Sequence, residues 1–155
     1  MSQAKELNTV FQKSRFLNIK GQLHDFGLPK IMGILNMTPD SFFEQSRVLH
    51  LNELLERAGA MIHDGADILD IGASSTRPNA QIHSAQEEID RLGTAIQALK
   101  KAFPSTLLSL DTYYGETAKF GIDQGIDLIN DISAGQFDPA LWPVVAQAKI
   151  PYILN

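Results

Sequence analysis

Short apolar runs alternate with stretches of helical spacing along most of this chain. Five of the runs are dense in isoleucine and leucine, show no regular polar alternation, and end in polar side chains. They lie at residues 30–36, 66–77, 106–112, 126–133 and 150–155. Runs of this kind are typical of strands that are buried on both faces. The pattern therefore predicts five buried strands.

Helical periodicity fills most of the intervals between these runs. In residues 84–103 apolar side chains recur three and four positions apart, and Ser84 and Glu87 have the spacing of a capping box at the start of that helix. Residues 52–65 and 115–125 also read as helices, and each ends in a glycine that suits a helix stop. We expect one helix in each of these three segments.

A fourth helical pattern lies in residues 138–148. Asp138 and Pro139 have the residue types of a helix cap followed by the first helical residue. Pro143 falls late for that assignment, which leaves two alternatives: the helix begins nearer Leu141, or it is bent.

The order of these segments predicts the fold class, which is α/β. Strands that alternate with helices, with a glycine stop before the next strand, indicate βαβ units and a parallel sheet. The first 30 residues do not follow this alternation. Residues 16–26 instead predict a small hairpin that turns near Gly21 and precedes the first parallel strand.

Composition narrows the class of protein. The chain has 155 residues, of which 44% are hydrophobic and 20% charged, values that are ordinary for one globular domain. Its formal net charge is −5 and it has no basic run, which argues against nucleic acid or a membrane surface as a partner. Because the chain has no cysteine, disulfides, thiolate metal sites and a cysteine nucleophile are excluded.

Other familiar signals do not occur in the sequence. No apolar stretch approaches the ~20 residues of a membrane span, and residues 1–15 lack the apolar core of a signal peptide. We therefore expect a cytoplasmic location. The four histidines have no metal-ligand spacing, and the glycines form neither a dinucleotide-binding motif nor a P-loop.

Polar side chains gather at the carboxyl ends of the apolar runs. They are Asn36, residues 74–77, Asp111, Asn130 with Asp131, and Asn155. Asparagine and aspartate after a strand are also common as helix caps, but here five strand ends coincide. In (β/α) barrels and in doubly wound sheets those ends form the ligand-binding face. We therefore expect a ligand site at these ends.

Two loops carry candidate chemistry. The loop after Leu35, in the stretch LNMTPDSFF, combines hydrogen-bonding side chains with Phe42 and Phe43, which we interpret as one wall of a site. In the stretch SSTRP, hydroxyls lie next to the guanidinium of Arg77, a combination suited to a cluster of phosphate oxygens.

Four segments resemble, in order and spacing, signature segments of dihydropteroate synthase. The segments are IMGILNMTPDSFF, GADILDIGASSTRP, LLSLDTY and GIDLINDISAG. The resemblance covers about residues 16–155 and implies a (β/α)8 TIM barrel, with residues 31–155 as strands one to five and residues 1–30 as an extension and hairpin. Because a full barrel takes about 250 residues, we expect residues 1–155 to form a single pterin-binding domain that is incomplete, the amino-terminal part of a synthase.

The resemblance also implies an activity and its ligands. Dihydropteroate synthases condense 6-hydroxymethyl-7,8-dihydropterin pyrophosphate with p-aminobenzoate, giving 7,8-dihydropteroate and pyrophosphate with the help of Mg²⁺. By this resemblance Asn36 would bind the metal and the pyrophosphate, and Thr76 and Arg77 would contact the pyrophosphate of the pterin substrate. An amide oxygen is a hard, neutral ligand that suits Mg²⁺.

The remaining roles concern the two rings. By the same resemblance Asp111 and Asn130 would hold the pterin, since a carboxylate accepts from its N–H groups and an amide both donates and accepts. Asp111 would also stabilise the positive charge that develops on the pterin methylene. Phe42 would pack against the p-aminobenzoate ring. The implied partners are these small molecules and, for full-length members, a second copy of the chain.

Several alternatives stay open. The first loop departs from the family at residues 43–46, and the second departs at Ala73, Ser74 and Asn79. Further site residues of the family belong to the other half of the barrel, so we expect this chain alone to be inactive. One alternative is the pterin-binding domain of a corrinoid-dependent methyltransferase, against which TPDSF and STRP argue. Another is a half-barrel that binds a pterin without catalysis.

Overall fold

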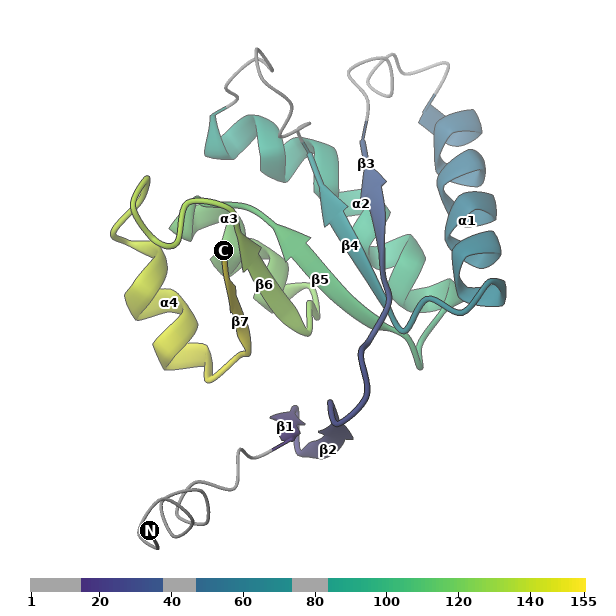
Figure 1. Cartoon of the computed structure of the whole chain (residues 1–155). Helices are drawn as coiled ribbons and strands as arrows, with labels where there is room; N and C mark the ends of the chain where they lie inside the picture. Colours follow the sequence, from purple (N-terminus) through teal and green to yellow (C-terminus); the bar gives the residue numbers. More distant parts are fainter. Residues whose placement is uncertain (1–14, 38–46, 74–83) are drawn as a thin grey trace, which may run out of the picture.

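A curved parallel sheet with helices on one side forms the body of the chain (Figure 1). The computed structural model describes residues 15–37, 47–73 and 84–155. The elements in chain order are β1 (Phe16–Ile19), β2 (Gln22–Asp25), β3 (Met32–Asn36), α1 (Arg47–His63), β4 (Ile68–Gly72), α2 (Ala85–Ala102), β5 (Leu107–Asp111), α3 (Gly115–Asp123), β6 (Leu128–Asp131), α4 (Leu141–Ala148) and β7 (Tyr152–Leu154). The sheet order β3-β4-β5-β6-β7 follows the chain order, and all its pairs are parallel.

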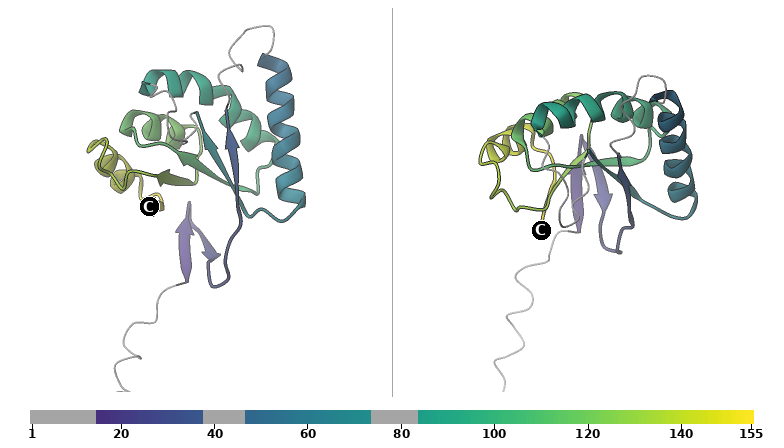
Figure 2. Two further views of the ribbon diagram at one scale, coloured as in Figure 1. Left: turned by 45° about the horizontal axis from the view of Figure 1, so that its top comes forward. Right: turned by 90° about the horizontal axis from the view of Figure 1, so that it is seen from above.

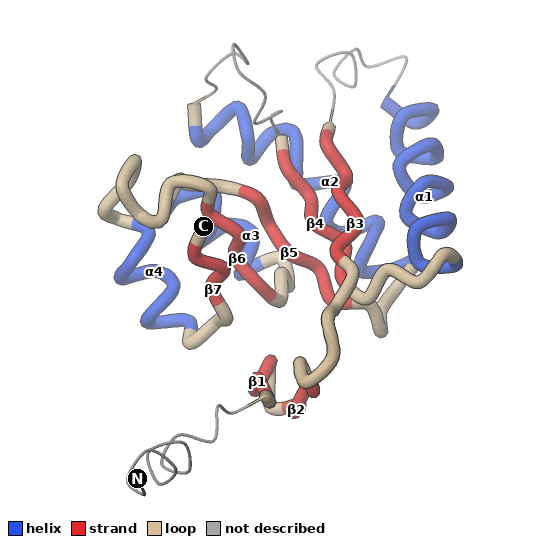
Figure 3. The backbone as a smooth tube through the Cα atoms, viewed as in Figure 1, coloured by secondary structure: helices blue, strands red, loops and turns tan. Residues whose placement is uncertain are grey.

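The four helices lie together on one face of the sheet, here called the outer face (Figures 2 and 3). Strand residues that point to the outer face pack with the helices into the main hydrophobic core. They include Leu35, Leu69, Ile71, Leu108, Leu110 and Ile129. The opposite face of the sheet is called the inner face below. The predicted βαβ alternation is therefore confirmed.

Local capping signals correctly marked the start of α2 and the ends of α1 and α3. At the start of α2, Ser84 Oγ accepts from the Glu87 N–H (3.3 Å) and Glu87 Oε2 accepts from the Ser84 N–H (2.8 Å), which is the predicted capping box. Gly65 and Gly125 have φ values of +105° and +96°, as a left-handed helix stop requires. The helix predicted at 52–65 begins earlier, at Arg47.

The prediction that Asp138 and Pro139 cap and begin the fourth helix is wrong. Helix α4 begins at Leu141, which is one of the two alternatives that the sequence left open. The Asp138 carboxylate has two partners: Oδ1 accepts from the Ala140 N–H in the turn before α4 (3.0 Å), and Oδ2 accepts from the Gly115 N–H at the start of α3 (2.7 Å). The Asp138 carbonyl accepts from the Leu141 N–H (3.1 Å), so Asp138 closes a turn and the helix begins after it.

Burial on both faces holds for β4 but not for the strands at the edges of the sheet. Every residue of β4 is buried, whereas Ile34 on β3 is 58% exposed and Leu154 on β7 is 66% exposed. In the part of the chain that the structure describes, β3 and β7 each pair with one neighbour. Ile34 lies on the inner face, which the helices leave uncovered, whereas Leu154, the register partner of Asp131, is exposed because β7 is an edge strand. The expectation of double burial is therefore wrong for these two strands.

The predicted hairpin is confirmed and lies below the amino ends of the parallel strands (Figure 1). Strands β1 and β2 pair from Ile19 and Gln22, which leaves a two-residue turn of Lys20 and Gly21 with φ values of +50° and +85°. Ile19 is 3% exposed and packs with Ile68 and Leu128 in a second hydrophobic cluster. The hairpin thus forms an apolar floor under the sheet.

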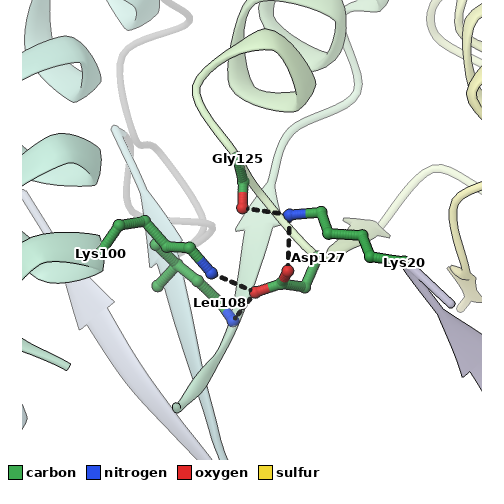
Figure 4. A network of polar contacts seen from close by, with 5 residues as sticks. All are labelled: Lys20, Lys100, Leu108, Gly125 and Asp127. Carbon is green, nitrogen blue, oxygen red and sulfur yellow. Dashed lines mark hydrogen bonds and ion pairs between the residues drawn. The ribbon is translucent and has the colours of Figure 1, made fainter. Parts of the chain in front are cut away.

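A polar network fixes the hairpin to the sheet (Figure 4). Lys20 Nζ donates to the Gly125 carbonyl (2.5 Å) and to Asp127 Oδ1 (2.7 Å). Asp127 Oδ2 accepts from Lys100 Nζ (2.6 Å) and from the Leu108 N–H (2.9 Å). Burial opposes ionisation of Asp127, but the hydrogen bonds from Lys100 and Lys20 outweigh it and hold the pKa of Asp127 below its usual value.

Within residues 15–37, 47–73 and 84–155, no helix is both long enough and apolar enough to span a bilayer.

Candidate functional site

The register of the sheet aligns the candidate residues in one row at the carboxyl ends of the strands. Asn36 pairs with Gly72, Gly72 with Asp111, and Asp111 with Asn130. Paired positions on neighbouring strands present their side chains on the same face. The row therefore brings together three polar side chains that lie far apart in the sequence, on the inner face.

Two further rows lie below this one on the inner face. The middle row contains Ile34, Asp70, Ser109 and Leu128, and the lowest contains Met32, Ile68 and Leu107. The lowest row packs with Ile19 of the hairpin. The inner face thus changes from an apolar floor to a polar rim.

Gly72 leaves a gap between two of the candidate residues. A Cβ atom at this position would lie 3.4 Å from Asp111 Oδ2 and 3.5 Å from Asn36 Oδ1. The two oxygens therefore approach the same point above the glycine. A side chain there would fill the space into which they face, so the lack of one is part of the geometry of the site.

The environment of Asp111 disfavours its charge. Burial raises the pKa of Asp111 to about 7, and the nearby carboxylates of Asp70, Glu88 and Asp131 add to the effect. Near neutral pH the side chain is therefore poised between its two protonation states. A cation or an array of N–H donors would favour the ionised form.

Helix α2 supports the end of β5 from behind. Glu88 is 3% exposed, and its Oε2 accepts from Thr112 Oγ1 (2.7 Å). Thr112 Oγ1 in turn accepts from the Tyr114 N–H (3.1 Å). Burial raises the pKa of Glu88. These bonds hold the turn that follows Asp111 against the helix.

Asn130 is held by partners on both sides. Its Nδ2 donates to Asp70 Oδ2 (2.9 Å), and its Oδ1 accepts from Asn155 Nδ2 (2.8 Å). Asn155, at the end of the last apolar run, thus meets the other strand-end residues as the sequence predicted. Asp70 was not among the predicted site residues.

Asp131, next in the chain, belongs to the outer face. Its carboxylate accepts from the N–H groups of Ser133 and Gly135, both at 2.7 Å, and from the Tyr152 hydroxyl at 2.6 Å. Burial opposes ionisation, but the hydrogen bonds from Tyr152 and Ser133 outweigh it and hold the pKa of Asp131 below its usual value. Asp131 therefore holds the loop after β6.

The structure brings together three of the six predicted site residues, namely Asn36, Asp111 and Asn130. Phe42, Thr76 and Arg77 lie outside the described residues. Sequence reasoning missed Asp70 and the role of Gly72. The available signal was a charged residue in the middle of an apolar run, two positions before a glycine at the strand end.

The donor set at Gly72 fits a magnesium ion. The amide oxygen of Asn36 and the carboxylate oxygen of Asp111 are hard ligands, and they face the same gap. No cluster of three or more histidine, aspartate or glutamate side chains that could hold a metal occurs in the described part of the chain. An ion here would therefore take its other ligands from water or substrate phosphate, as Mg²⁺ commonly does.

Comparison with known proteins agrees with this fold. Residues 32–155 match the family model described as pterin binding enzyme, so the chain belongs to the family of pterin-binding enzymes. Its relatives within that family include dihydropteroate synthases. The enzyme of Streptococcus pyogenes serotype M1 is 42% identical over 128 residues, which are 83% of this chain and 48% of the relative.

Solved structures give the same result. The dihydropteroate synthase of Xanthomonas albilineans, solved with 4-aminobenzoic acid, matches 91% of this chain and 52% of its own with a TM-score of 0.78 and 33% identity. That of Anaplasma phagocytophilum, with bound 6-hydroxymethylpterin-monophosphate, matches 81% of this chain and 48% of its own with a TM-score of 0.73 and 33% identity. The chain spans about half the length of these synthases, and the predicted partial (β/α) barrel is confirmed.

Proposed function

We propose that this chain supplies the pterin-binding and magnesium-binding part of a dihydropteroate synthase active site. The observation that carries the proposal is the row of Asn36, Asp111 and Asn130, which converge around Gly72 at the carboxyl end of the parallel sheet. The ligands in the Xanthomonas and Anaplasma structures, 4-aminobenzoic acid and a hydroxymethylpterin phosphate, support the choice of substrates.

Each residue of the row has a role in this proposal. Asp111 accepts hydrogen bonds from the aminopyrimidinone edge of the pterin, and Asn130 donates to that edge and accepts from it. Asn36, through its amide oxygen, and Asp111 would hold Mg²⁺. The bound ion would neutralise negative charge on the pyrophosphate leaving group. Thr76 and Arg77 contact that pyrophosphate, and Phe42 packs against the aromatic amine.

The reaction is a substitution at the pterin methylene carbon. The bond from this carbon to the pyrophosphate oxygen breaks, and its electron pair leaves with the pyrophosphate. The amine nitrogen of p-aminobenzoate forms the new bond to carbon and then loses a proton. Because positive charge develops on the methylene as the pyrophosphate leaves, the ionised Asp111 stabilises the transition state.

Binding of 6-hydroxymethylpterin to the 155-residue chain, followed by pterin fluorescence with Mg²⁺ present, tests the ligand. The wild-type chain should bind, and Asn130→Ala should weaken binding at least about tenfold, the loss of one hydrogen bond inside a site. Asn52→Ala, an exposed asparagine on α1, is the matched control and should bind as the wild type does. A wild-type chain that does not bind the pterin would contradict the proposal.

A second measurement distinguishes the reaction class. We expect the chain to bind 6-hydroxymethylpterin pyrophosphate more tightly than 5-methyltetrahydrofolate, because Asn36 and Arg77 serve the phosphates. The methyltransferase alternative predicts the reverse order. Release of pyrophosphate in the presence of p-aminobenzoate then separates a catalytic chain from one that only binds, and for this chain alone we expect binding without turnover.

A further inference from the structure

A carboxylate lies inside the sheet with only part of its hydrogen-bonding capacity used. Asp70 is 3% exposed and sits at the centre of β4, where every residue is buried. Its Oδ1 has no hydrogen-bond partner in the described part of the chain, and neither does Ser109 Oγ at the paired position on β5. A buried carboxylate is unfavourable unless it is paired. Among the described residues, the hydrogen bond that Asp70 accepts from Asn130 is the interaction that compensates this buried carboxylate.

We propose that Asp70 is the positioning residue that fixes which way round the Asn130 carboxamide sits. The two ends of an asparagine side chain have nearly the same shape, so the partners decide which end faces which neighbour. An ionised carboxylate can only accept. Asp70 Oδ2 therefore selects the NH₂ end of Asn130, to which it is bound at 2.9 Å.

The other partner of Asn130 is a weaker determinant. Asn155 Nδ2 donates to Asn130 Oδ1 at 2.8 Å and to the Asp131 carbonyl at 3.3 Å. Asn155 is exposed, so water competes for both bonds, and its own carboxamide has two ends. Asp70 is 3% exposed, so its bond from Asn130 is shielded from water, and hydrogen bonds in such surroundings are stronger than exposed ones. The orientation of Asn130 is therefore set from the Asp70 side.

This orientation has a consequence for ligand recognition, a step that rests on the proposed function. With one N–H bound to Asp70 and one lone pair bound to Asn155, Asn130 keeps one donor and one acceptor for a ligand. Its register partner Asp111 adds an acceptor beside them. A rotated carboxamide would exchange the donor and the acceptor, and a pterin edge would then meet mismatched groups. Asp70 thus sets specificity without touching the ligand.

Nuclear magnetic resonance on the ligand-free chain tests the orientation directly. In the wild type we expect slow hydrogen exchange of one Asn130 Nδ2 proton and a scalar coupling across the hydrogen bond from Asn130 Nδ2 to the Asp70 carboxyl carbon. Asp70→Ala should speed that exchange at least tenfold. Asp70→Asn should restore the shape but give two carboxamide orientations. Ser109→Ala removes the other unpartnered polar group of the middle row and should leave the Asn130 signals unchanged.

Unchanged Asn130 signals in Asp70→Asn would overturn the proposal. Should both Asp70 variants fail to fold, the coupling in the wild type still decides, because its absence overturns the proposal as well. Binding of 6-hydroxymethylpterin adds a separate readout: Asp70→Asn should bind at least tenfold more weakly, and Ser109→Ala as the wild type does. Equal binding by wild type and Asp70→Asn overturns the specificity role. A wild-type chain without pterin affinity contradicts the proposed function, while the resonance data still decide the role of Asp70.

Discussion

Replacing Asp111 with asparagine should stabilise the folded chain, and the gain should depend on pH. The pKa of Asp111 rises on folding from its ordinary value of 3.8 to about 7. The folded state therefore binds this proton more tightly than the unfolded state does, so stability falls as pH rises from about 4 to about 7 and stays level above that. The asparagine variant has no such proton and is free of this loss.

The size of the effect follows from the shift. About three pKa units correspond to about 4 kcal/mol, but Asp111 is partly open to solvent, so screening reduces the figure to about 2 kcal/mol. We expect Asp111→Asn to be more stable than the wild type by about this amount at pH 8. At pH 5, where the unfolded carboxyl is ionised and the folded one is not, the gap should be less than half as large.

Urea unfolding of both chains at pH 5, 6, 7 and 8 measures the gap. Asp123→Asn is the matched control, because the same change is made at a side chain that is 61% exposed on α3 and forms only an exposed ion pair with Lys119 (3.0 Å), which is worth little. A gap for Asp111→Asn that is constant over this range, or a variant less stable at pH 8, would refute the reasoning. The expected outcome would mean that Asp111 is kept ionisable for ligand binding at the expense of stability.

Four further outcomes follow from the structure. Asp127→Asn should lower the free energy of unfolding by about 2 kcal/mol at pH 7, measured by urea unfolding. The pKa of Asp127 is held below its ordinary 3.8, so the two chains should become equally stable as pH falls through that lowered pKa. Gly72→Ala places a Cβ 3.3 Å from the Asp111 Cβ; pterin titrations with Mg²⁺ should show at least tenfold weaker binding while the urea midpoint changes little. Gly115→Ala would bring a Cβ to 2.8 Å from the Ala140 carbonyl carbon and should lower the free energy of unfolding by about 1–3 kcal/mol. Gly59→Ala, whose Cβ would lie 3.6 Å from the Phe103 ring, should instead raise the free energy of unfolding by about 0.5–1 kcal/mol.

The parts of the fold that depend on neighbours in sequence were predictable. Periodicity identified the strands and helices, and the capping box of Ser84 and Glu87 placed the start of α2. The sequence left two alternatives for the start of α4, because Asp138 has the residue type of a cap but closes a turn with Ala140 and Leu141 before the helix. The second bond of its carboxylate, from the Gly115 N–H in another element, has no local signature.

The candidate site also has a part that the sequence predicted and a part that it did not. The polar strand ends marked Asn36, Asp111 and Asn130, since parallel strands bring their carboxyl ends to one edge. Asp70 escaped prediction because its partner, Asn130, lies 60 residues away on a strand that is not adjacent to β4. The role of Asp70 can be inferred only from the register of β4, β5 and β6, which periodicity alone does not fix.

The agreement between sheet order and chain order bears on how the protein is synthesised. Each parallel strand from β4 onward pairs with the strand that precedes it in the chain. Each new strand is therefore synthesised directly after its partner strand and the connecting helix, so no pairing within the parallel sheet depends on distant sequence. The hairpin is the exception, because Lys20 binds Asp127, which is synthesised 107 residues later. Closure of the floor is thus a late event, and it can occur only once β6 has been made.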